Sequence, residues 1–279
     1  MRRSNWTSSQ ASLTAYMNRS GQPGFHMTLD FPSAYEIASL DESGLAAHWD
    51  WVANDMPSLG TFGTFLSNHD NVRNHEVEVN RPASIHSTEG QLHAAVGLRL
   101  LGPGTPFIYY GNEIEMPDVD PGVGAPHRDR RHRQPFDWSA ATAQMADAGS
   151  TWSLHQDLID VRQARESLRR GDFQRVTSGS SSIFAYTRSY AGETSLVVVN
   201  TGTTTVSGIS IGLDSGSTAT NVFDWTESGT GLAFASGALS GSMSGGDIQV
   251  FDLTGSVADG SDIAPSIDAF SLDHPAHDQ

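Results

Sequence analysis

The sequence predicts an α/β fold followed by an all-β region, and three observations carry this prediction. Residues 89–101 place leucine or valine at every fourth position, which is typical of a helix with one buried face. Apolar runs at 61–67 and 105–111 flank this helix and predict strands. After residue 172 the chain changes to short apolar runs separated by Gly, Ser, Thr and Asn, as in antiparallel sheets.

Several elements can be assigned before the first apolar run. Residues 24–32, GFHMTLDFP, predict a short strand that ends at Pro32, and the next eight residues, SAYEIASL, predict a helix. A tryptophan-rich stretch at 44–57 predicts a second helix. The residues before 61 therefore predict one strand followed by two helices, which is compatible with an α/β fold.

The helix at 89–101 and the strand after it have clear boundaries. Ser87 or Thr88 is available as the N-cap, and Gly102 and Pro103 end the helix. The run at 105–111, TPFIYYG, contains no alternating polar residues. We therefore expect a strand that is buried on both faces within a parallel sheet.

A last helix is expected at about 152–170, followed by the all-β region. Its apolar stripe is completed by arginines in the last turn and by Gly171, a candidate C′ residue. We expect an α/β part at 1–172 and an antiparallel β-sandwich at 173–254. Residues 255–279 are acidic and polar, and we expect a disordered tail.

Composition excludes several classes of function. The 279 residues contain no cysteine, which excludes disulfides and Cys-ligated zinc. The net charge is −16 and every basic residue is arginine, so nucleic acid and anionic membranes are unfavourable partners. Adaptation to high salt and GC-rich coding bias both explain the absence of lysine. No apolar stretch approaches the ~20 residues of a membrane span, and the N-terminus does not resemble a signal peptide, which leaves the location open.

Polar side chains follow the strand at 61–67 directly. Asn68, His69 and Asp70 come after it, and Arg73 stands three residues further on. A carboxylate beside an imidazole can stabilise developing positive charge, which makes these residues candidates for a catalytic site. A helix cap at Asp70 is the simpler interpretation of these residues alone.

Three motifs in order carry a resemblance to a known family. FLSNHDNVR at 65–73, PGTPFIYYGNEIEMPD at 103–118 and RHRQPFDWS at 131–139 resemble the α-amylase family of glycoside hydrolases. The resemblance covers about residues 24–254. It implies a partial (β/α)8 TIM barrel, with about strands 6–8 present, followed by an antiparallel β-sandwich domain.

The resemblance also implies roles for the residues after the strand. Asp70 would be the carboxylate that stabilises the transition state, and His69 and Asn68 would bind the same sugar. Arg73 matches an arginine that in some members helps to hold a chloride. The implied substrate is an α-glucan or oligosaccharide, cleaved or transferred with retention. Calcium is common in the family, but its usual site would lie mostly outside this sequence.

Two essential groups of such an enzyme are not found. Retaining glycosidases need a nucleophile and a general acid/base, and neither the G-x-R-x-D pattern nor the acid of the fifth strand occurs here. A whole barrel typically takes about 250 residues. We therefore expect a C-terminal fragment that has little or no activity alone.

The alternative is a non-catalytic glycan-binding protein, or a half-barrel that a second copy or a missing N-terminal half completes. Such a partner would cover sheet edges and apolar surface that are otherwise exposed.

Other chemistry-bearing residues have simpler interpretations. Glu113 could line the cleft, whereas Glu115 is expected in a solvated loop. We expect one tyrosine of the pair at 109–110 to pack in the core, and Trp49 and Trp51 to do the same. Asp118 and Asp120 are discounted as calcium ligands, because they are too few for a calcium-binding loop. The arginines of 127–133 are expected to pair with carboxylates.

Overall fold

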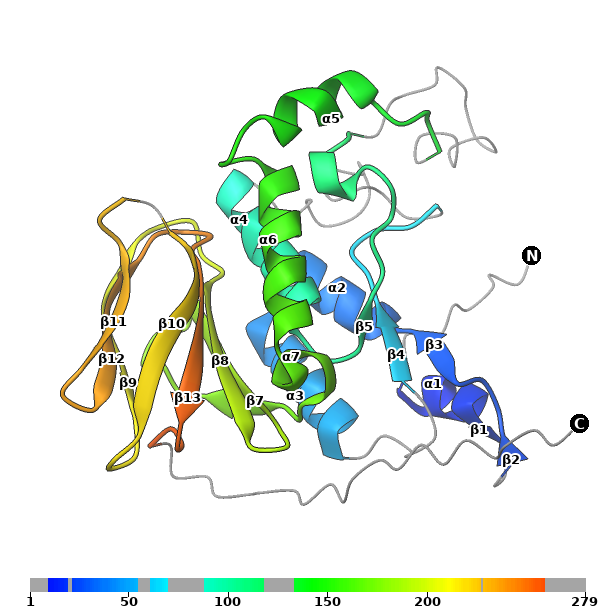
Figure 1. Ribbon diagram of the computed structural model, residues 1–279. Coiled ribbons are helices and arrows are strands. Elements are labelled where there is room, and N and C mark those ends of the chain that lie inside the picture. Colours follow the sequence, from blue (N-terminus) through cyan, green and yellow to red (C-terminus); the bar gives the residue numbers. More distant parts are fainter. Residues whose placement is uncertain are drawn as a thin grey trace, which may run out of the picture.

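The computed structural model describes residues 10–19, 22–54, 61–69, 88–117, 133–226 and 228–258. A layer of helices lies between a small parallel sheet and a pair of antiparallel sheets (Figure 1). None of the helices in these ranges is long and apolar enough to cross a membrane.

The parallel sheet has three strands in the order β3-β4-β5: Met27–Leu29, Thr61–Thr64 and Thr105–Pro106. Helices α2 (Phe31–Ser39) and α3 (Glu42–Asn54) follow β3, and α4 (Glu89–Leu101) connects β4 to β5. This alternation confirms the predicted α/β character. A helix that the sequence analysis missed, α1 (Gln10–Met17), precedes the small hairpin of β1 (Asn18–Arg19) and β2 (Gln22–Pro23).

Helix α4 has the predicted boundaries. Thr88 is its N-cap, because the threonine hydroxyl accepts a hydrogen bond from the Gln91 backbone N–H at 3.2 Å. Gly102 caps the other end. Every residue from Leu92 to Leu101 is buried, so this part of the helix is enclosed on all sides.

The helix predicted at 152–170 is two helices, α6 (Thr151–Ala164) and α7 (Glu166–Arg170). Between them Arg165 is extended, and its guanidinium binds the Asp252 carboxylate at 2.7 and 3.1 Å. Gly171 follows α7 with a φ of −63°, so its role is not a left-handed C′. A Cβ atom at Gly171 would lie 2.3 Å from the Ser167 carbonyl oxygen, and this close approach requires glycine.

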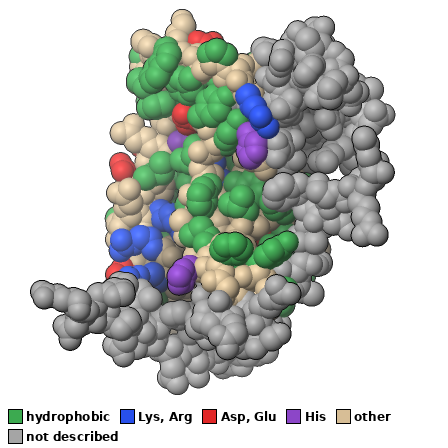
Figure 2. Space-filling model, turned by 90° about the vertical axis from the view of Figure 1, so that its right-hand side faces the viewer, with side chains coloured by type: hydrophobic (Ala, Val, Ile, Leu, Met, Phe, Trp, Pro, Cys, Tyr) green, Lys and Arg blue, Asp and Glu red, His purple; other side chains and the backbone are tan. Residues whose placement is uncertain are grey.

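The prediction of a strand buried on both faces at 105–111 is wrong. Strand β5 contains two residues only, and the Phe107 and Ile108 side chains after it are 46% and 39% exposed. Phe107 and Leu29 both lie over Gly63, since a Cβ atom there would come within 2.7 Å of the Phe107 ring. We call Leu29, Gly63, Phe107 and Ile108 the open face. Figure 2 looks onto this side and shows hydrophobic side chains gathered on it.

The all-β region forms two antiparallel sheets. The larger has the order β10-β13-β8-β7-β6 and the smaller β11-β12-β9. Their bounds are as follows: β6 Gln174–Val176, β7 Ile183–Tyr190, β8 Glu193–Asn200, β9 Val206–Gly212, β10 Thr218–Trp225, β11 Gly231–Ala235, β12 Ala238–Met243 and β13 Ile248–Thr254. The apolar runs that predicted strands after residue 172 lie at 182–190, 194–200, 205–213, 219–225 and 247–253, and they correspond to β7, β8, β9, β10 and β13. Strands β6, β11 and β12 were missed. Strands β6 and β12 lack a continuous apolar run, whereas β11 contains a short one at residues 232–235.

The residues after β13 begin against the smaller sheet, where Val257 forms a bridge with Leu213. Residues 259–279 of the predicted tail lie outside the described residues.

One apolar cluster joins the helices to the larger antiparallel sheet. It includes Ile37 and Trp49 from α2 and α3, most of α4, and side chains from β7, β8, β10 and β13. Trp49 is 1% exposed, which confirms its predicted place in the core. Trp51 is half-buried and packs against Phe62 with a ring-centroid distance of 5.8 Å.

Burial of His155 predicts a pH-dependent stability. Burial, and then the nearby Arg99 guanidinium, lower the pKa of His155 from 6.5 to about 3. The unfolded chain therefore binds one more proton than the folded chain between these values, and folding loses stability as the pH falls below 6.5. We expect His155→Gln to reduce the slope of unfolding free energy against pH by about 1.4 kcal/mol per pH unit.

Urea unfolding at several pH values from 7 to 4 measures this slope. His26→Gln is the matched control, because His26 is exposed. Equal slopes for His155→Gln and the parent chain would contradict the prediction.

Candidate functional site

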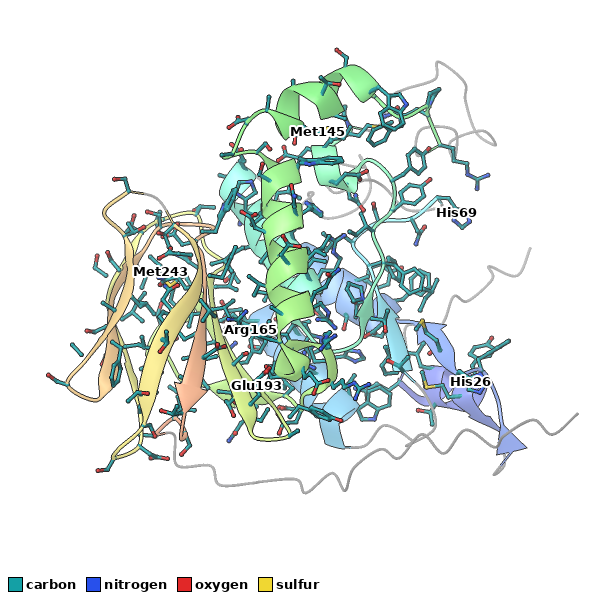
Figure 3. All side chains as sticks on the ribbon, in the orientation of Figure 1. His26, His69, Met145, Arg165, Glu193 and Met243 are labelled. Carbon is teal, nitrogen blue, oxygen red and sulfur yellow. The ribbon has the colours of Figure 1, made fainter. Side chains whose placement is uncertain are left out.

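The carboxyl ends of β3, β4 and β5 meet at one edge of the parallel sheet, because the three strands run in the same direction. After β4 the chain is buried through Ser67, half-buried at Asn68 and exposed at His69. Figure 3 labels His69 on the segment that leaves β4. The predicted exit of polar residues from a buried strand is therefore present at this edge.

A pair of buried side chains links the segments after β4 and β5. Ser67 and Asn112 are 1% and 7% exposed. The Ser67 hydroxyl lies 3.1 Å from Asn112 Oδ1 and 2.8 Å from Asn112 Nδ2. Asn112 begins the short 3-10 helix η1 (Asn112–Ile114). This contact fixes where the chain emerges at Asn68 and His69.

The third predicted motif also reaches this edge. Arg133 donates a hydrogen bond from Nε to the His69 carbonyl oxygen at 3.2 Å. The Tyr110 hydroxyl donates to the Gln134 carbonyl oxygen at 2.7 Å. Residues from the three motifs that carry the family resemblance are thus in contact, although they are separated by 24 to 64 positions in the sequence.

Two charged residues expected in the site are not among the described residues. Asp70 and Arg73 lie outside the described residues, and so do Asp118, Asp120 and residues 127–132. The sugar-binding role of Asp70 and the chloride near Arg73 stay predictions.

Glu115 occupies different surroundings from those expected, and Glu113 lies near a buried arginine. Burial lowers the pKa of Arg99 to about 10, and the nearby Glu113 carboxylate opposes this change. The negative charge of Glu113 thus favours the charged form of the buried Arg99 guanidinium. The expectation of a solvated Glu115 is wrong, because this residue is half-buried and its carboxylate accepts a hydrogen bond from the Thr151 hydroxyl.

The tyrosine pair is only half-buried. The rings of Tyr109 and Tyr110 lie 4.7 Å apart in an edge-to-face arrangement. Tyr110 packs on a small cluster formed by Ile114, Met116 and Ala141, away from the main core. The expectation that one tyrosine packs in the core holds only in this limited form.

Sequence reasoning missed a buried carboxylate at the end of β3. Asp30 is 1% exposed and caps α2, accepting hydrogen bonds from the Ser33 backbone N–H at 3.1 Å and from the Ser33 hydroxyl at 2.7 Å. His48 Nε2 lies 2.8 Å from the same carboxylate. An Asp two residues before a Pro is an N-cap signal that could have found it. Its contacts with α2 and α3 give Asp30 a structural role.

Within the described ranges, Glu89, His93 and Glu115 form the one group whose donor atoms could hold a metal, all within 4.8 Å of one another. His93 Nδ1 accepts the Trp225 indole N–H at 3.3 Å, so the ring proton sits on Nε2, 3.1 Å from the Thr151 hydroxyl. Both ring nitrogens are therefore engaged. The set also lacks the six to eight oxygens that calcium prefers, so it does not fit that ion.

The contact between Ser67 and Asn112 predicts a measurable stability loss. Replacing Ser67 with Ala leaves the buried Asn112 amide without this partner, and we expect a loss of about 1–3 kcal/mol in unfolding free energy. Urea unfolding measures it, with the exposed Ser210→Ala as control, expected within about 0.5 kcal/mol of the parent. A Ser67→Ala chain as stable as this control would show that the contact contributes nothing.

Comparisons with known proteins bear on this edge of the sheet. Residues 25–172, more than half of the chain, match the family model of the α-amylase catalytic domain. An α-glucosidase from Culex pipiens is 28% identical over 163 residues, covering 55% of this chain and 26% of that protein. Alpha-amylase 3 from Dictyoglomus thermophilum is 29% identical over 159 residues, covering 49% and 29%.

A solved structure agrees at the level of the fold. The α-amylase from H. orenii superposes with a TM-score of 0.70 at 19% identity, covering 88% of this chain and 52% of that chain. The chain spans 26% and 29% of the length of the two curated relatives. From the family match over residues 25–172, we conclude that the chain belongs to the α-amylase family.

Proposed function

We propose that this chain is the C-terminal part of a retaining glycoside hydrolase that acts on α-glucosidic linkages in starch, maltooligosaccharides or related α-glucans. The observation that carries the proposal is the convergence of the three motifs at the carboxyl edge of the parallel sheet, through Ser67, Asn112 and Arg133. The names of the two relatives, α-glucosidase and α-amylase, support the substrate class.

In this proposal the parallel sheet corresponds to strands six to eight of a (β/α)8 barrel. Asp70 follows His69 directly in the sequence and provides the carboxylate that stabilises the oxocarbenium-like transition state. Asn68 and His69 bind hydroxyls of the same sugar. The buried Ser67–Asn112 contact supports this role, because it holds the backbone that carries these side chains.

The remaining catalytic groups come from outside this sequence. A retaining mechanism needs a nucleophile and an acid/base about 5–5.5 Å apart, and we assign both to the five strand–helix units that would complete the barrel. Asp70 cannot serve as both groups at once. The isolated chain is therefore proposed to be inactive, whereas the completed enzyme is active.

Activity measurements on two forms of the protein test the proposal. We expect no release of reducing sugar from maltoheptaose by the isolated chain. In the native product, Asp70→Asn should lower kcat/KM by roughly 100- to 1,000-fold, because a charge that acts in the transition state is lost. Asp157→Asn, at an exposed position on α6, is the control and should keep full activity.

The intact mass of the native product decides which form acts in the cell, since this chain alone is 29.9 kDa. Activity of the isolated chain that falls in Asp70→Asn would contradict its inactivity. Full activity of Asp70→Asn in a heavier native product would contradict the assigned role.

A second candidate, a half-barrel completed by a partner, is favoured by the open face. Leu29 and Phe107 are 42% and 46% exposed, on a sheet whose outer strands β3 and β5 have one neighbour each among the described residues. Apolar side chains and free strand edges on one surface favour association. The partner is either a second copy or a separate chain that supplies the missing strands.

Light scattering during size-exclusion chromatography tests this candidate. We expect the isolated chain to form a defined dimer, well above 29.9 kDa, and Phe107→Asp to shift it toward the monomer, because a charge then replaces a buried apolar contact. Trp138→Asp is the control, since Trp138 is 72% exposed but lies outside the open face. A monomeric parent chain, or heterogeneous aggregates, would count against the partner-completed form.

A further inference from the structure

A recess of about 710 Å³ lies where the start of α4 meets the loops of the antiparallel sheets. This volume is in the range of small-molecule sites, which often occur at such junctions between structural units. Its walls include Glu89 and His93 from α4, Thr203–Thr205 from the loop after β8, and Trp225 at the end of β10. The recess therefore draws its walls from two parts of the fold that are more than 100 positions apart.

Glycines that line the recess make close backbone contacts with one another. A Cβ atom on Gly90 would lie 2.3 Å from the Gly245 carbonyl oxygen, and one on Gly246 would lie 2.3 Å from the Gly90 Cα. The adjoining turn is held by Asp247, which is 3% exposed and accepts hydrogen bonds from the Ser244 N–H and the Thr230 hydroxyl at 2.6 Å each. The site is thus pre-formed, which lowers the entropy cost of binding.

The chemistry of the walls selects a class of ligand. The indole N–H of Trp225 is engaged with His93, so the remainder of this side chain offers carbon surface. Thr203, Thr204 and Thr205 are exposed, and a threonine hydroxyl can both donate and accept a hydrogen bond. The Thr205 hydroxyl lies 3.3 Å from the Ser244 hydroxyl, which uses part of this capacity.

The charges of the residues that line the recess narrow the class of ligand further. The Glu89 side chain is 67% exposed and adds an acceptor. No arginine is among the described residues that line the recess, and burial lowers the pKa of His93, which favours the neutral ring. A phosphate or another anion would find no cation here, whereas a neutral polyhydroxylated ligand can use the hydroxyls, the carboxylate and the apolar ring together.

We propose that this recess is a saccharide-binding site that takes a neutral oligosaccharide of the α-glucan class. The recess opens between α4 and the antiparallel sheets, whereas the parallel sheet with its candidate site lies on the other side of the helix layer (Figure 1). The two sites are therefore separate. The choice of an α-glucan rests on the proposed function. The inference of a neutral, polyhydroxylated ligand comes from the chemistry of the walls and does not depend on that function.

Calorimetric titration of the full 279-residue chain with maltoheptaose tests the proposal. We expect binding by the parent chain and at least a tenfold weaker affinity in Thr204→Arg, whose long side chain would occupy the recess. Trp225→Ala should have the same effect by removing the apolar surface. Ser210→Arg is the matched control, because Ser210 is an exposed residue of β9 outside the recess, and it should bind as the parent does.

Circular dichroism of each variant establishes that it is folded, and Thr204→Arg changes an exposed side chain, so the test does not depend on Trp225→Ala alone. Absence of maltoheptaose binding by the folded parent chain would overturn the proposal. Unchanged binding in folded Thr204→Arg would overturn it as well.

A second set of variants separates this site from the proposed catalytic one. Asp70→Asn and His69→Ala should leave binding in the recess intact. Binding that is lost in these two variants but kept in Thr204→Arg would place the saccharide at the end of β4, which overturns the recess site and supports the proposed function. Binding that depends on Thr204, in a native product without glycosidase activity, would support the recess site while the proposed function fails.

Discussion

The packing of Trp49 is the interaction on which the rest of the structure depends. Its indole, 1% exposed, makes edge-to-face contacts with Phe173, Phe184 and Tyr186 at ring-centroid distances of 5.3, 5.8 and 5.4 Å. Its N–H donates to the Ser33 hydroxyl at 3.1 Å. One side chain of α3 thus contacts α2 and the larger antiparallel sheet at once. Truncating such a residue typically costs about 3–5 kcal/mol, a large share of the ~5–15 kcal/mol that stabilises a domain.

Two buried arginines donate hydrogen bonds to backbone carbonyls at the C-terminal end of α4. Arg162 of α6 donates to the carbonyl oxygens of Leu100 and Gly102 at 2.7 and 3.0 Å, and Arg188 of β7 donates to that of Leu101 at 3.3 Å. Unpaired carbonyls at a helix end carry partial negative charge. The two guanidinium groups donate hydrogen bonds to these carbonyls and stabilise that charge. Burial lowers the pKa of each guanidinium to about 10, which still leaves both charged at neutral pH. The path from α4 into β5 is therefore fixed from both parts of the fold.

Local patterns predicted the elements whose stability is local. The periodicity and caps of α4 lie within fifteen consecutive residues, so the sequence predicted its bounds correctly. The exposure of Phe107 could not be predicted in this way, because it depends on which strands cover the sheet, and an apolar run does not indicate which strands pair with it. The break between α6 and α7 at Arg165 was not predicted for a similar reason. Its guanidinium binds Asp252, 87 positions away, and no pattern of nearby residues indicates that contact.

The candidate site shows the same division between local and distant information. The motif at residues 68–70 predicted polar side chains at a strand end, and the structure places Asn68 and His69 there. The buried partner of Ser67 was not predicted, because Asn112 lies 45 positions away and its amide has no distinctive pattern. Asp30 was missed for a local reason, since Pro32 was interpreted as the end of a strand while it stands in the first turn of α2.

A chain of hydrogen bonds links the antiparallel sheets to the segment that follows β5. The Trp225 indole of β10 donates to His93 of α4, whose other nitrogen contacts the Thr151 hydroxyl of α6 at 3.1 Å. Thr151 in turn donates to Glu115, in the turn after η1. Because Glu115 adopts a positive φ of 53°, a conformation that costs energy in a residue other than glycine, this anchor stabilises a turn that is unfavourable by itself. The antiparallel sheets thus hold the segment that follows β5, so they contribute to the shape of the edge that carries the candidate site.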